Sequence, residues 1–390
     1  MIPGIPQADP LPLPAPPWLL AALLVVTFLL HVLPMNFALG GSIMGAVARL
    51  RARDGLHPHH AALASWIGKA LPIVMAAAVT AGVAALLFLQ ALFGRLFFTS
   101  SVLIAWPWFS VVVLLLAAYG GAYALGSPSP RSRERLCVAL AVPAALLVVG
   151  FIYSNNMSLM LRPAVFVAMY RSSGSGFHLN LADPVLLPRF LHATTGAIAV
   201  TGLSVALYGL WSKSRVRGVF RETEGHDGAS AAGTHGFSRW AIAWGSRWFV
   251  AATAVNVVFG TWWLIALPTE ILLGTMGEAL GLTLSLAGGI LFAIAAFGLV
   301  MMAVKADSPG GPLIGAAGSL VAAILMMILT RDQIRKALLE AAGYVPIAWT
   351  ATQWGPLLIF LGLLVGATVA VVWMVRVLVK ARHRGDVQAA

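Results

Sequence analysis

The chain is poor in charged residues, and in acidic residues above all. Its 390 residues are only 10% charged, with 13 Asp or Glu against 25 Lys or Arg. An ordinary globular domain is about 25% charged, so this composition excludes a water-soluble protein. The longest polar stretches run to about 30 residues, which is too short to enclose a hydrophobic core of their own. The sequence therefore contains no detachable soluble domain.

Cysteine is almost absent as well. Cys137 is the one cysteine of the chain, which excludes an internal disulfide and a CxxCH attachment site. No c-type haem is therefore expected, and any haem would be bound non-covalently. The net charge of +12 does not indicate nucleic acid as a partner, because the basic residues cluster in alternate loops between apolar runs, which is typical of membrane topology.

Apolar residues make up 60% of the chain. A helix needs about 20 such residues to cross a bilayer, and the sequence predicts an all-α, polytopic membrane protein with nine spans. We expect one transmembrane domain over residues 1–390, in which residues 18–211 form spans one to five and residues 240–375 form spans six to nine. The predicted spans are 18–48, 64–94, 99–125, 136–156, 188–211, 240–266, 279–303, 312–330 and 352–375.

The basic residues predict the orientation of the chain. The loops after spans one, three, five and seven, together with the C-terminal tail, hold sixteen Lys or Arg, whereas the other side holds seven. Cytoplasmic loops carry the excess of Lys and Arg. The N-terminus is therefore expected outside and the C-terminus in the cytoplasm, as for a multi-pass protein of the cell (inner) membrane surrounded by lipid.

Two of the nine histidines lie inside apolar runs. His192 is near the start of PRFLHATTGAIAVTGLSVALYGLW, and His31 lies within TFLLHVLPMNFALGG. An ionisable residue in a membrane span is by default a functional-site hypothesis, and imidazole is a common ligand of haem iron. The alternative is that each histidine forms a hydrogen bond to a carbonyl group on a neighbouring helix.

Small residues accompany both histidines. Gly196, Ala199, Gly202 and Ala206 follow His192 on one helical face, and glycines at 40 and 41 follow His31. Such a face would let a flat macrocycle approach the helix closely. Ordinary helix–helix packing through small residues explains the face equally well.

Methionine can complete the coordination of a haem iron. Met276 is expected at the outer start of span seven, level with His192, and Met157 at the outer end of span four. Most of the 13 methionines are expected to fill irregular gaps between helices. Carboxylates are absent from spans one to five, which argues against a proton-coupled transporter.

Several of these stretches, in order, resemble subunit I of the cytochrome bd quinol oxidases. LLHVLPMNFALG places His31 nine residues before Gly40, as the family's haem-ligating histidine precedes a glycine. AGVAALLFLQALFG is similar to the family's second-span segment, and YSNNMSLMLRP has Met157 at the methionine of a short asparagine-to-methionine segment. PRFLHATTGAIAVTGL resembles the family's helix whose histidine ligates the low-spin haem b. The resemblance covers roughly the first 215 residues.

The resemblance implies a haem b bound through His192, with His31 as a second candidate iron ligand. It favours Met276 over Met157 as the further ligand of the iron. It also implies a hetero-oligomer with a subunit I-like chain or another redox subunit, and it allows a quinol as substrate.

The chain departs from the family where that family carries its catalytic groups. The region FSVVVLLLAAY has no acid where the family has glutamates, Gln90 stands in place of another glutamate, and only Arg331 matches the family's glycine-arginine-glutamine segment. The quinol-binding loop is reduced to Pro268–Glu278. We therefore expect an electron-transfer or companion subunit that is not catalytic alone. A haem-free structural subunit is the alternative; a small-molecule transporter is weaker, because no inverted repeat or pair of broken helices is evident.

Overall fold

The structure is a computed structural model that describes residues 12–127, 132–220, 228–345, 347 and 349–388. Within these residues the chain is helical and forms no strand; Leu13 and Thr350 make an isolated bridge. The helices are α1 (Pro17–Arg51), α2 (Pro58–Leu103), α3 (Ala105–Gly126), α4 (Ser132–Leu159), α5 (Phe166–Ser172), α6 (Leu186–Phe220), α7 (Gly228–Ile265), α8 (Thr269–Leu273), α9 (Leu280–Lys305), α10 (Gly310–Ala341) and α11 (Trp354–Gln388).

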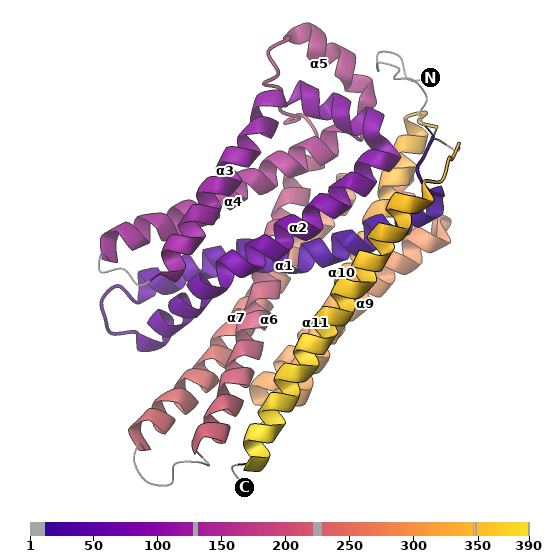
Figure 1. The fold of residues 1–390 in the computed structure, drawn as a ribbon. Helices are drawn as coiled ribbons and strands as arrows, with labels where there is room; N and C mark the ends of the chain where they lie inside the picture. The colour runs from indigo at the N-terminus through magenta and orange to yellow at the C-terminus, as the bar shows by residue number, and fades with distance from the viewer. Residues whose placement is uncertain (1–11, 128–131, 221–227, 346, 348, 389–390) are drawn as a thin grey trace.

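Nine helices in the described part of the chain are long and apolar enough to cross a membrane. They are α1 to α4, α6, α7 and α9 to α11, which confirms the predicted all-α fold and the predicted number of spans. Figure 1 shows them as a bundle with α5 at the top of the view, the turn between α1 and α2 at the left, and the ends of α6, α7 and α11 at the bottom. Which end faces the cytoplasm stays a prediction from the basic loops.

The eighth span is longer than the sequence predicted. The predicted span ended at residue 330. In the structure α10 continues without a break to Ala341, so Arg331 and Arg335 belong to the bundle and not to an external loop.

The small residues that follow His192 pack against α7. A Cβ added at Gly202 would lie 2.6 Å from the backbone nitrogen of Phe249 and 2.8 Å from the carbonyl oxygen of Gly245. Ala199 and Ala206 are buried in the same contact. This face therefore brings two helix backbones together, and the packing interpretation of these residues describes what the structure shows.

Candidate functional site

A cavity of about 400 Å³ lies inside the bundle, between α1, α2, α4, α6 and α10. Pockets for small molecules and cofactors have volumes of roughly 300–1,000 Å³ and mostly apolar walls with a few polar groups. Most of the wall here is Leu, Val, Ala, Met and Phe. The polar side chains in it are those of His31, Tyr153, Ser154, Arg189, Thr194, Arg331, Asp332 and Arg335.

His31 projects into this cavity from α1. Its Nδ1 lies 2.7 Å from the carbonyl oxygen of Ala78 on α2. A carbonyl only accepts, so Nδ1 carries the proton and donates it, and Nε2 keeps a lone pair. This is the arrangement of metal-binding histidines, whose second ring nitrogen usually donates to a carbonyl or carboxylate.

A glycine on α2 makes the position of this ring possible. A Cβ added at Gly82 would lie 2.7 Å from Nδ1 of His31, closer than a Cβ carbon comes to another heavy atom. The α2 backbone therefore approaches the imidazole directly, and the hydrogen bond to Ala78 and the contact with Gly82 together fix the plane of the ring.

Met157 lies in the wall of the same cavity as His31, as do Met35 and Met75. The structure thus brings together two of the four predicted site residues. Met157 comes from α4, near the end of the cavity where the polar residues gather, because it also lines a small adjoining void with Arg189 and Trp263.

His192 lies outside the cavity, between α6 and α7. Its Nδ1 is 3.2 Å from the carbonyl oxygen of Asn256, and its ring lies over Gly260 and against Trp263, with ring centroids 6.0 Å apart. Thr195, one turn later on α6, donates to the side-chain oxygen of Asn256 at 2.5 Å. The His192 ring is therefore also held by a carbonyl acceptor, with Nε2 left to accept.

Met276 is apart from these groups. It lies in the short helical segment Gly274–Glu278 before α9, and 74% of its surface is exposed. Its role as an iron ligand stays a prediction, and no contact in the described structure brings it to either histidine.

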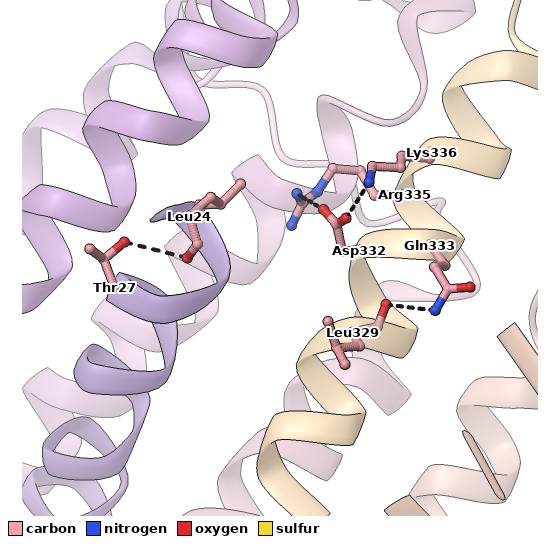
Figure 2. Close-up of polar contacts among 7 residues, drawn as sticks. All are labelled: Leu24, Thr27, Leu329, Asp332, Gln333, Arg335 and Lys336. Atoms are coloured by element: carbon pink, nitrogen blue, oxygen red, sulfur yellow. Dashed lines mark hydrogen bonds and ion pairs between the residues drawn. The ribbon is translucent and has the colours of Figure 1, made fainter. Parts of the chain in front are cut away.

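Three arginines line the cavity, and none of them was predicted from the sequence as a site residue, although Arg331 was matched to a segment of the resembled family. Arg189 reaches the cavity from α6, and Arg331 and Arg335 reach it from α10. Figure 2 shows the carboxylate of Asp332 between Arg335 and Lys336, at 2.9 and 2.7 Å. Their signal was present in TRDQIRKALLEA, where the two arginines are four residues apart and so share one helical face.

The wall also shows which donors a ligand would meet. Among the described residues no three His, Cys, Asp or Glu side chains converge to hold a bare metal ion. Apart from Tyr153 and from Asp332, which is paired with Arg335 and Lys336, the metal donors of the cavity are one imidazole and three thioethers. This set suits an iron that already has most of its ligands from a macrocycle.

Comparison with solved structures finds the same fold in bd oxidase from Geobacillus thermodenitrificans. The TM-score is 0.66, the identity is 12%, and the match covers 96% of this chain and 100% of that one. No family model and no curated protein matches the sequence. At 12% identity the likeness shows the fold alone: a multi-pass helical membrane protein with the architecture of a bd oxidase chain.

Proposed function

We propose that the chain is a haem-binding membrane subunit of a quinol-linked respiratory complex. The observation that carries this proposal is the apolar cavity with His31 in its wall and the Nδ1 of His31 held by the Ala78 carbonyl. The fold shared with a bd oxidase supports it. The proposed location is the cell (inner) membrane, with a partner chain that resembles bd oxidase subunit I or another redox subunit.

The residues present fit a non-covalent haem b. His31 would hold the iron through Nε2, the apolar side chains of the wall would contact the macrocycle, and Met157 is a thioether in the same wall that could serve as a further ligand. Haem, when bound, supplies a one-electron couple between ferrous and ferric iron. The chain itself orients the imidazole through the Ala78 carbonyl and surrounds the cavity with mostly apolar side chains, and both set the potential of such a couple.

A second haem position at His192 is proposed from the sequence resemblance. Its Nδ1 meets the Asn256 carbonyl at 3.2 Å, which supports the same ring tautomer as at His31. Gly260 is the residue that leaves space for the ring. Because α7 occupies the small-residue face below it, a macrocycle at His192 would have to lie toward the start of α6.

The experiment is an optical spectrum of the full chain purified in mild detergent after growth with haem. A reduced-minus-oxidised b-type band is expected. His31→Ala should remove most of it, and His192→Ala should remove a separate low-spin component if the second position is occupied. The matched control is His57→Ala, because His57 is exposed in the turn between α1 and α2, outside the cavity.

A wild-type chain that is folded and inserted yet shows no haem band overturns this proposal. The two imidazole–carbonyl hydrogen bonds would then be contacts that hold helices together, and the chain would be a haem-free scaffold for its partner. An unchanged band in both histidine variants would place the haem elsewhere.

A further inference from the structure

Three arginines gather at one end of the cavity. Arg189 comes from α6, and Arg331 and Arg335 come from consecutive turns of α10. Protein surrounds all three guanidinium groups. The side chain of Arg335 nevertheless keeps 12% of its surface accessible, and all three also line the small adjoining void. Their remaining accessible surface therefore faces the inside of the bundle.

The carboxylates nearby do not balance this charge. Asp332 pairs with Arg335 and also with Lys336. Asp183, which acts on Arg189, accepts from the Asn180 side chain and the Val185 backbone at 3.1 Å each.

The positive charges of Arg189 and Arg331 are not fully compensated. Neither forms an ion pair among the described residues, and Nε of Arg331 is buried with no hydrogen-bond partner. An uncompensated charge inside a membrane protein is strongly unfavourable.

Aromatic rings hold two of the arginines in place without neutralising them. The guanidinium carbon of Arg331 lies 4.9 Å from the ring centre of Phe28, and that of Arg335 lies 5.4 Å from the ring centre of Phe93. Phe28 also packs against His31, with ring centroids 6.0 Å apart. One aromatic side chain therefore touches both the imidazole and the arginine end of the cavity.

We infer that Arg189, Arg331 and Arg335 form an anion site that receives the acid groups of an amphipathic ligand whose apolar body extends toward His31. Guanidinium groups bind carboxylates through paired, charge-assisted hydrogen bonds. Two acid groups would match the two arginines that lack an ion pair. This inference rests on the proposed function for the identity of the ligand, which is a tetrapyrrole dicarboxylate.

The test separates acid recognition from iron ligation. The full chain in detergent is titrated with iron-free protoporphyrin IX and with its dimethyl ester, which has the same ring and no acid groups. Quenching of tryptophan fluorescence measures binding. We expect the free acid to bind about tenfold or more tightly than the ester, since charge-assisted hydrogen bonds are lost with the ester.

Variants locate the site. Arg331→Gln and Arg189→Gln are each expected to weaken binding of the free acid by about tenfold and to leave ester binding unchanged. Arg171→Gln is the matched control, because Arg171 is exposed at the end of α5. The comparison of acid with ester in the wild-type chain needs no variant, so it remains decisive where an arginine variant does not fold.

Equal affinity for the acid and the ester overturns the inference, and so does failure of protoporphyrin IX to bind. His31→Ala distinguishes this failure from that of the proposed function: it should remove most of the reduced-minus-oxidised b-type band and leave protoporphyrin IX binding intact. If haem shows histidine ligation while the ester binds as well as the acid, the proposed function stands and the anion site is wrong.

Discussion

At the scale of single residues, a histidine becomes a candidate ligand only through its neighbours. His31 and His192 both place Nδ1 against a backbone carbonyl, of Ala78 and Asn256 respectively. Each also lies over a glycine, Gly82 or Gly260. The sequence indicated both histidines as candidate ligands, because ionisable residues are rare in apolar runs. It did not indicate the carbonyl partners, which come from other helices 47 and 64 residues away.

Gly82→Ala tests the close contact with His31. The added methyl would lie 2.7 Å from Nδ1, so the ring or α2 must shift. Overpacking of this kind costs about 1–3 kcal/mol, and the b-type band should weaken or move with it. Gly120→Ala is the control, because open space surrounds Gly120 on α3. Thermal unfolding and the optical spectrum provide the two measurements; equal behaviour of both variants would contradict the proposed contact.

At the scale of the elements, hydropathy located all nine spans but ended some of them too early: α2 continues past residue 94 to Leu103, and α10 continues past residue 330 to Ala341. The mean hydropathy of a sliding window falls at TRDQIRK because three cations and an acid enter the window. A helix can nevertheless continue through such a segment, because helix formation does not depend on that mean. Ile334 and Leu339 are buried, so the apolar face of α10 continues beside the charged one. Arg331, Asp332 and Arg335 line the interior cavity, which an average over all faces of the helix does not reveal.

The arginines of the cavity also affect the count of basic residues that predicts the orientation, and leaving them out makes the difference between the two sides larger. Arg189, Arg331 and Arg335 were counted on the outer side, but they line the interior cavity. The outer side then retains only Arg95, Arg162, Arg171 and Lys336 against sixteen basic residues on the other. Reporter fusions within 215–235 should read cytoplasmic and fusions within 170–180 external. Residues 221–227 lie outside the described part of the structure. The reverse pattern would invert every inside and outside assignment made above.

At the scale of the whole molecule, the site exists only because distant spans meet. The cavity takes its walls from α1, α2, α4, α6 and α10, with one residue from α3, and an apolar stretch of sequence does not encode which spans become neighbours. The sequence therefore predicted the class, the number of helices and two residues of the cavity, His31 and Met157. It could not predict that His192 would lie against α7, or that Arg189 would meet Arg331.

The completed bundle predicts that this chain alone does not reduce oxygen with quinol. Among the described residues of the cavity wall Asp332 is the one carboxylate, and it is engaged by Arg335 and Lys336. From α3 the wall receives Leu115, and the neighbouring Val111–Val113 bring no acid where the resembled family has glutamates. Loss of a proton donor costs well over tenfold in rate, since about 1.4 kcal/mol corresponds to each factor of ten.

The connection before α9 is too short to contain the second feature that the resembled family needs for turnover, its quinol-binding loop. Only α8 and the segment Gly274–Glu278 stand where the resembled family has its quinol-binding loop. Oxygen uptake by the folded, haem-loaded chain with a reduced quinol should therefore not exceed the rate of the quinol alone, and the partner chain should be needed for turnover. Sustained cyanide-insensitive uptake without a partner would mean that the chain holds a complete oxygen-reducing site, and the companion role would then be wrong.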